Sequence, residues 1–284
     1  MINFIKYNIL VFTNQEKSYN KKMYEIPKNL ERLNTILRLL SENKKLDISE
    51  LCHILAVSQN TIYRDLRRLE KDNKLIRIKK GAAIYDTDIS NMEEYPFYFR
   101  LEENKKIKIK ISEIAARLIK DNETIFLDAS TTCVYLSRNL TKKNINNLTV
   151  VTSSPIIAIE LLKNKNINIL SLGGNINRNN YACYSDLNLK LLDNLNIQKA
   201  FFSCNGFSIH KGFTEAIEEE YKFKKVILNL CDNNIMIVDH SKYNKLSTYK
   251  FCDFRNIDSL ITDISFTKDE ADEIKNLGTN LILV

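Results

Sequence analysis

The chain has 284 residues, of which 44% are apolar and 27% are charged, and its 42 lysines and arginines exceed its 35 aspartates and glutamates. This length accommodates a small domain and a larger one, each with its own core. The six cysteines have no CxxC or metal-like spacing, which indicates a reduced, cytoplasmic protein, so we expect neither a metal nor a cofactor. No apolar run approaches the roughly 20 residues that a membrane span requires, so we expect no membrane partner.

Residues 1–27 differ in character from the rest of the chain and are interpreted as an extension. Their apolar stretch is interrupted by polar residues and lacks the small-residue cleavage site of a signal peptide. We hypothesise that translation of the native protein begins at Met23, because the first predicted helix starts a few residues later. An intact mass that includes residues 1–22 would contradict this hypothesis.

Residues 28–85 carry the pattern of a winged helix-turn-helix domain. Leucines recur on one side of a first helix, from Lys28 to Glu42, and Asp47 or Ser49 caps the helix that follows. A short turn at residues 56–58 then leads directly into a third helix. This order of helices predicts a small domain that binds DNA.

The third helix has two chemically different faces. Ser58 stands at the N-cap, where its hydroxyl can accept a hydrogen bond from the amide of Thr61. Ile62, Leu66 and Leu69 recur at helical spacing and should face the preceding helix. The opposite face carries groups that read base edges or hold phosphates in a major groove, and an alternating apolar and basic wing follows the helix. The residues predicted to contact DNA are Ser58, Asn60, Thr61, Tyr63, Arg64 and Arg67, together with Lys79 and Lys80 at the tip of the wing.

The alternative interpretation of these arginines is a solvated helix surface on which they pair with Asp65 and Glu70. The charge distribution favours DNA binding instead. Residues 28–81 contain 13 Lys and Arg against 7 Asp and Glu, which leaves 29 against 28 for the remainder of the chain. The excess positive charge is therefore almost confined to the predicted DNA-binding segment, where counterion release would make the affinity depend on salt.

Residues 86–101 are predicted to form a linker whose aromatic cluster docks on one of the domains. Residues 102–120 regain helical spacing and would connect the two domains, in position to transmit a change of state. Beyond them, short β-branched runs alternate with amphipathic segments, which predicts an α/β domain over residues 102–284 with a mostly parallel sheet between helices. The expected strands are 124–127, 148–152, 167–172, 199–203, 234–239, 258–262 and 281–284.

Polar residues and glycines follow several of these strands. Ligands of parallel sheets bind beyond the carboxyl ends of the strands, where these residues should gather. The hydroxyls at 130–132 open a helix and suit a phosphate or another anion. One polar strand end is ordinary, but five at a single edge predict a ligand site. The residues predicted to bind the ligand are Asp128, Ser130, Thr131, Thr132, Ser153, Gly173, Gly174, Gly206, Thr214 and Lys242.

The chain resembles the DeoR family of bacterial transcriptional repressors from residue 28 to its end. The resemblance rests on Arg32, Ile36, Ser58, Thr61, Ile62, Arg64, Asp65, Leu66 and Leu69, and on the ligand-site residues other than Ser153, with Gly212, Glu220, Lys224, Asp239 and Ser241. It implies a sensor domain related to ribose-phosphate isomerases that binds a phosphorylated sugar. It further implies that residues 130–132 hold the phosphate, that Lys242 adds charge or contacts a sugar hydroxyl, and that Asp128 orients the loop.

The leading hypothesis is a cytoplasmic repressor of sugar metabolism genes whose affinity for operator DNA changes when a sugar phosphate binds. We expect a dimer or tetramer, because two copies usually bind two half-sites. Two alternatives stay open: a constitutive DNA binder without ligand, and a sugar-phosphate isomerase with Asp128, Asp239 or Glu220 as base near Lys242. The i, i+4 spacing of Glu220 and Lys224 favours a structural pair over two residues that face the pocket.

Overall fold

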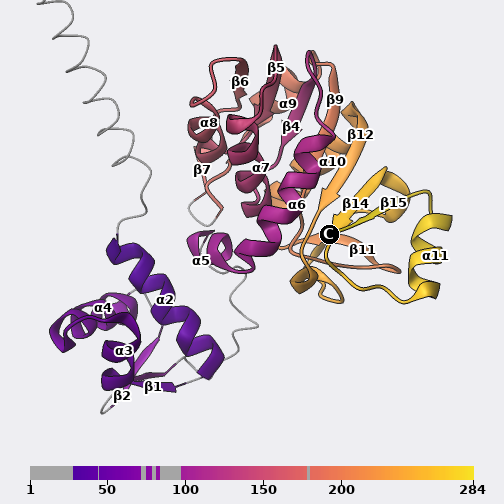
Figure 1. Cartoon of the computed structure of the whole chain (residues 1–284). Coiled ribbons are helices and arrows are strands. Elements are labelled where there is room, and N and C mark those ends of the chain that lie inside the picture. Colours follow the sequence, from indigo (N-terminus) through magenta and orange to yellow (C-terminus); the bar gives the residue numbers. More distant parts are fainter. Residues whose placement is uncertain (1–27, 44, 72–74, 79–80, 84–96, 178–179) are drawn as a thin grey trace, which may run out of the picture. The chain divides into compact units, whose positions relative to one another are not determined.

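A computed structural model of the chain describes residues 28–43, 45–71, 75–78, 81–83, 97–177 and 180–284 (Figure 1). The chain divides between Met92 and Glu93 into two compact units, which we call the N-terminal and the C-terminal unit. One apolar core lies in the N-terminal unit, and two lie in the C-terminal unit. The extension at residues 1–27, with the hypothesised start at Met23, is outside the described residues.

The N-terminal unit is a winged helix-turn-helix, and its three strands form an antiparallel sheet in the order β1-β3-β2. The β2–β3 hairpin is the predicted wing, and Lys79 and Lys80, between its strands in sequence, are outside the described residues. Gly81 is required where β3 meets β1, because a Cβ there would lie 2.0 Å from the carbonyl oxygen of Leu46. The elements are α2 (Lys28–Asn43), β1 (Lys45–Asp47), α3 (Ile48–Leu55), α4 (Gln59–Lys71), β2 (Ile76–Ile78) and β3 (Gly81–Ala83).

The turn between α3 and α4 lies where the sequence predicts it. Ala56 adopts a left-handed conformation with φ of 50°, and its amide donates to the carbonyl of Cys52, which ends α3. The amide of Thr61 donates to Ser58 Oγ at 3.3 Å, so the predicted N-cap of α4 is confirmed. Ile62 and Leu66 are fully buried in the core between the helices.

An ion pair joins α2 to α4 on the inner side of the unit. Arg32 Nε donates to Asp65 Oδ2 at 2.5 Å, and Arg32 Nη2 donates to Asp65 Oδ1 at 3.3 Å. The hydrogen-bonded carboxylate raises the pKa of Arg32 above its ordinary value. Asp65 is thus engaged with Arg32, contrary to the alternative interpretation in which it pairs with the arginines of the exposed surface.

A seven-stranded parallel sheet forms the centre of the C-terminal unit (Figure 1). Its order is β15-β14-β12-β9-β4-β5-β6, and each neighbouring pair is parallel. The seven expected strands are the seven that form this sheet, so the predicted α/β fold class is confirmed. The strands are β4 (Thr124–Leu127), β5 (Leu148–Thr152), β6 (Ile167–Ser171), β9 (Ile197–Phe202), β12 (Cys231–Ile237), β14 (Ser259–Thr262) and β15 (Asn280–Leu283).

Helices cover both faces of this sheet, and successive residues of strand β4 belong to different cores. Ile125 and Leu127 pack in one core with helices α5 to α8, whereas Phe126 packs in the other with α9 to α11. The first set is α5 (Phe97–Glu102), α6 (Lys105–Arg117), α7 (Thr131–Lys142) and α8 (Pro155–Leu161). The second set is α9 (Asp186–Leu192), α10 (Glu218–Leu230) and α11 (Lys268–Asn276).

Residues 97–101, which the sequence places in the linker, belong to helix α5 of the C-terminal unit. Phe97 is 1% exposed and Leu101 is 2% exposed, because both pack in the core that α6 and α7 share. The predicted docking of the linker aromatics therefore holds for Phe97, while residues 84–96 are outside the described part of the chain.

Smaller elements complete the C-terminal unit. β7 (Asn175–Ile176) and β8 (Cys183–Tyr184) form a hairpin. A second antiparallel sheet contains β10 (Gly206–Ser208), β11 (Gly212–Glu215) and β13 (Tyr249–Cys252), and two short 3-10 helices are η2 (His240–Lys242) and η3 (Phe254–Asn256). Across the described residues, no helix is both long and apolar enough to cross a membrane, and no cluster of side chains has the composition of a metal site.

Candidate functional site

The polar face of α4 is exposed over its whole length. Asn60, Tyr63, Arg64 and Arg67 are all exposed, and the side chain of Thr61 is partly so. Within the part of the chain that the structure describes, neither Arg64 nor Arg67 has an acidic partner. Their guanidinium groups are therefore available to bind base edges or phosphates, and the DNA contacts predicted from the sequence stay a prediction.

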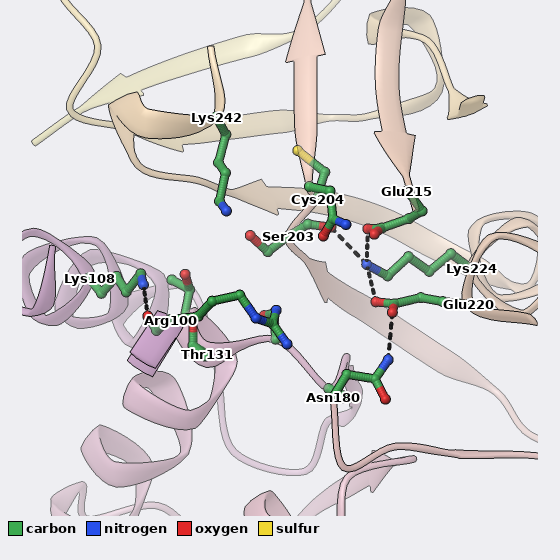
Figure 2. A pocket seen from close by; sticks show the side chains of 14 residues that line it. Arg100, Lys108, Thr131, Asn180, Ser203, Cys204, Glu215, Glu220, Lys224 and Lys242 are labelled. Atoms are coloured by element: carbon green, nitrogen blue, oxygen red, sulfur yellow. Dashed lines mark hydrogen bonds and ion pairs between the residues drawn. The ribbon is translucent and has the colours of Figure 1, made fainter. Parts of the chain in front are cut away.

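A pocket opens in the C-terminal unit beyond the carboxyl ends of β4, β9 and β12 (Figure 2). The loops that follow these strands line it, as expected for a parallel sheet. Strand β11, helices α5, α6 and α10, and the segment between β7 and β8 add further side chains. The lining residues are Arg100, Lys108, Ala129, Ser130, Thr131, Thr132, Asn180, Ser203, Cys204, Asn205, Glu215, Glu220, Lys224 and Lys242.

One part of the pocket is suited to an anion. Ser130 is the N-cap of α7, where its Oγ accepts a hydrogen bond from the amide of Cys133 at 3.2 Å. Thr131 and Thr132 form the first turn of that helix, whose free amides and positive dipole end attract negative charge. Lys242 adds a cation from the opposite wall (Figure 2).

Lys108 is a second cation of the pocket, and it is 2% exposed on the inner face of α6. Its ammonium donates to the carbonyl oxygen of Arg100 near the end of α5 (Figure 2). Burial lowers the pKa of Lys108 to about 8, while the charge of Asp239 acts in the opposite direction and that of Lys242 lowers the pKa further. Among the described residues the Arg100 carbonyl is its one hydrogen-bond acceptor, so the ammonium has donors left for a ligand.

The other part of the pocket contains a buried ammonium surrounded by carboxylates. Lys224 is 3% exposed, and its Nζ donates to the carbonyl oxygen of Ser203 at 2.9 Å. The same Nζ lies 2.5 Å from Glu215 Oε1, 2.9 Å from Glu220 Oε1 and 3.2 Å from Asp128 Oδ2. Three carboxylates thus share one cation, and we call these four side chains the Lys224 cluster.

The charge balance of the Lys224 cluster keeps its lysine protonated. Burial alone would lower the pKa of Lys224, but Glu215, Glu220 and Asp128 outweigh burial and raise it well above its ordinary value. Asn180 Nδ2 donates to the second oxygen of Glu220 at 2.7 Å. Glu220 and Lys224 therefore form the predicted i, i+4 pair and also line the pocket.

The structure brings together four of the residues predicted to bind the ligand, namely Ser130, Thr131, Thr132 and Lys242. Asp128 lies behind the lining residues. Its Oδ1 accepts from the amide of Ser130 at 3.0 Å and its Oδ2 from the amide of Ser203 at 2.8 Å. These bonds hold two of the loops that line the pocket, which is the orienting role that the resemblance implies.

Ser153, Gly173 and Gly174 do not line the pocket, in contrast to their predicted role. Ser153 is 1% exposed, and its carbonyl accepts from the amide of Cys183 at 2.8 Å, which fastens the end of β5 to β8. The carbonyl of Gly173 accepts from Asn188 Nδ2 at 2.8 Å. Ser153 thus stabilises the β7–β8 hairpin, and Gly173 stabilises the position of α9.

Gly206 and Thr214 also lie outside the lining. A Cβ on Gly206 would lie 2.4 Å from the carbonyl oxygen of Lys245, so the close backbone approach explains this glycine. Thr214 Oγ1 donates to the carbonyl of Gly206 at 2.7 Å and accepts from the amide of Ser247 at 2.9 Å. Both residues therefore stabilise the small sheet beside the pocket.

Two family models cover this chain: the DeoR-like helix-turn-helix domain matches residues 32–88, and the DeoR C terminal sensor domain matches residues 103–264. The chain belongs to the DeoR family. It is a DNA-binding transcriptional regulator and not an enzyme, in agreement with the names of its curated relatives. Its sensor domain is the one that contains the pocket.

Curated relatives match nearly the whole length of this DeoR-family chain. The HTH-type transcriptional regulator GolR of Listeria innocua is 34% identical over 249 residues, which is 87% of this chain and 96% of that protein. The HTH-type transcriptional repressor GlcR of Bacillus subtilis is 32% identical over 253 residues, which is 89% of this chain and 95% of that protein. Among solved structures, ribose 5-phosphate isomerase A of Methanocaldococcus jannaschii matches with a TM-score of 0.37 and 16% identity, over 49% of this chain and 55% of that one.

The sequence prediction missed several residues of the sensor pocket, and one carried a usable signal. Lys108 recurs with Ile111 and Ala115 at the spacing of the buried face of α6, so a charged residue stands where an apolar one is expected. The others depend on how distant segments meet. The missed residues are Arg100, Lys108, Asn180, Ser203, Cys204 and Glu215.

Replacing Lys224 by methionine should destabilise the sensor domain by about 3–5 kcal/mol, because it leaves buried carboxylates without their cation. The unpaired carboxylates would bind protons more tightly in the folded than in the unfolded state, so the loss should shrink as the pH falls. Urea denaturation of both proteins, followed by circular dichroism at several pH values, measures the loss of unfolding free energy.

The matched control is Lys222→Met on the same helix, where the ammonium is 65% exposed and pairs with Glu218. Its unfolding midpoint should hardly change. Equal effects of the two substitutions would contradict the structural role given to the Lys224 cluster.

Proposed function

We propose that this DeoR-family regulator is a cytoplasmic repressor of sugar metabolism genes, whose affinity for operator DNA changes when a phosphorylated sugar binds in the sensor pocket. The observation that carries the proposal is the presence of two opposite chemistries in one pocket: hydroxyls, amides and cations on one side, and the Lys224 cluster on the other. A sugar phosphate has a matching pair of chemistries, an anionic group and a set of hydroxyl donors.

In the proposed complex, Thr131, Thr132 and the amides that open α7 surround the phosphate, and Lys108 and Lys242 neutralise it. Glu215 and Glu220 accept hydrogen bonds from sugar hydroxyls, because carboxylate oxygens have more than one acceptor site each. The ligand changes gene expression only if it prefers one of two states that differ in DNA affinity.

On the DNA side, the exposed face of α4 enters the major groove. The proposed contacts are Ser58, Asn60, Thr61, Tyr63, Arg64 and Arg67, with Lys79 and Lys80 of the wing on the phosphates. We propose that the protein binds DNA as a homodimer or homotetramer, since one helix reads only a short half-site. Light scattering of the purified protein measures this state.

Thermal unfolding of the full-length protein against a panel of sugar phosphates and their unphosphorylated parents tests the proposed effector. One phosphate should raise the unfolding temperature by several degrees, and its parent should not, because ligand binding stabilises the folded state. Thr131→Val should reduce the shift. Thr141→Val, the same change near the end of α7 and away from the lining residues, is the control. Shifts of equal size for each sugar and its phosphate would exclude the proposed anion site.

Phosphate binding should weaken as the pH rises through about 8, because Lys108 has a pKa of about 8 and then loses its charge. A phosphate monoester gains its second negative charge near pH 6. The affinity for the phosphate should therefore be greatest between about pH 6 and the Lys108 pKa of about 8. Titration of the identified effector by calorimetry across this range measures the dependence. The affinity of the wild type for the phosphate should fall at high pH, and that of Lys108→Met should not. An equal fall in affinity in both proteins would show that another group is responsible.

Arg64→Ala should weaken binding to operator DNA by about 1–3 kcal/mol if Arg64 forms a bidentate contact with a base. Lys80→Ala should weaken binding to all sequences about equally and reduce the salt slope by about 1. Mobility-shift titrations on operator and random DNA at several salt concentrations separate the two effects. The assignment fails if both substitutions weaken both DNAs to the same extent.

A further inference from the structure

Helix α5 is the first described element of the sensor domain, and residues 84–96 connect it in sequence to the DNA-binding unit. It contains six residues, Phe97–Glu102. A helix of this length is unstable by itself in water, so its contacts with the rest of the domain decide whether it forms. Its last carbonyl groups in particular have no partners within the helix.

Two of the groups that hold α5 are hydrogen-bond donors to these carbonyls. Tyr135 OH of α7 donates to the carbonyl of Leu101 at 2.9 Å. The Lys108 ammonium donates to the carbonyl of Arg100, and this second donor is a lining residue of the pocket. The contacts that stabilise α5 therefore include a group that a ligand in the pocket can reach.

A third contact also leads from α5 to the pocket. The ring of Phe97 packs edge-on against that of Tyr181, with centroids 5.4 Å apart. Tyr181 follows Asn180, whose amide donates to Glu220 of the Lys224 cluster. The guanidinium of Arg100 is directed toward Asn180 and Glu220 (Figure 2).

The neighbouring start of α6 is attached to a different part of the domain. Asn104, the N-cap of α6, has a left-handed φ of 50°, and its side chain donates to Asp239 Oδ1 at the end of β12 at 2.9 Å. This bond fixes the beginning of α6 to the sheet. A loss of the Lys108 contact would then remove one of the bonds that stabilise α5 while α6 stays in place.

We propose that α5 is the element through which the pocket acts on the DNA-binding unit, and that an anion bound beside Thr131 withdraws the Lys108 ammonium from the Arg100 carbonyl and loosens α5. An ammonium binds a phosphate oxygen more strongly than a neutral carbonyl, so a bound anion draws the Lys108 ammonium toward itself and away from the carbonyl. The inference rests on the proposed phosphate site and adds the residue by which its occupancy is transmitted.

Hydrogen–deuterium exchange of the full-length protein, read by mass spectrometry on peptides that contain residues 97–103, tests this inference with inorganic phosphate as the probe. Phosphate should accelerate exchange in these peptides in the wild type. Lys108→Met should accelerate it by about tenfold without phosphate, as expected from the loss of one hydrogen bond from a charged donor. Added phosphate should have no further effect in this variant.

Lys110→Met is the matched control, because Lys110 is exposed on the same helix, does not line the pocket, and its replacement leaves the Lys108 bond to α5 intact. Its exchange without phosphate should equal that of the wild type, and saturating phosphate should still accelerate it. Thermal unfolding at the same phosphate concentrations reports binding independently of exchange.

The outcomes separate the inference from the proposed function. Phosphate that stabilises the wild type against heat but leaves exchange in α5 unchanged, or slows it, would overturn the inference alone. Unchanged exchange in Lys108→Met without phosphate would do the same. Phosphate that fails to bind even at saturating concentration would overturn the proposed anion site and, with it, the inference.

Discussion

The architecture of the sensor pocket depends on the buried ammonium of Lys224. A charge removed from water must be paired, and Lys224 is paired from three directions, by the loop after β4, by β11 and by its own helix α10. Because its Nζ also donates a hydrogen bond to the Ser203 carbonyl, Lys224 also fixes the end of β9. Segments that lie far apart in the sequence are thus held around one point at the carboxyl edge of the sheet.

The same cluster explains why the pocket suits binding better than proton transfer. A general base must be free to accept a proton from its substrate. Here Glu215 and Asp128 are held by Lys224, and Glu220 is held by both Lys224 and Asn180. Carboxylates engaged in this way are already occupied by donors, but they keep lone pairs that accept hydrogen bonds from hydroxyls. The cluster is therefore chemically consistent with a regulator that senses a polyhydroxylated anion.

The sequence was sufficient for the parts of the molecule that local physics determines. Buried strands follow from β-branched runs, and the cap at Ser58 and the hydroxyl loop at 130–132 follow from the chemistry of helix starts. Tertiary contacts were not accessible in this way. The burial of Glu215 depends on how β11 meets α10, and Thr214, one residue before it, bonds to backbone although its hydroxyl suggested a ligand contact.

Lys108 is the residue at which local pattern and tertiary role conflict. Its position on the inner face of α6 would be filled most stably by an apolar side chain, and burial already lowers its pKa. A ligand can shift an equilibrium only by the difference in its affinity for the two states. If the Lys108 contact stabilises α5 by about 1–3 kcal/mol, its loss corresponds to a change in DNA affinity of roughly 5- to 150-fold, which is the usual range of coupling between two sites. A much larger stabilisation would keep α5 in place whether or not the ligand is bound, so a short helix that has a displaceable ammonium among its stabilising contacts suits a switch.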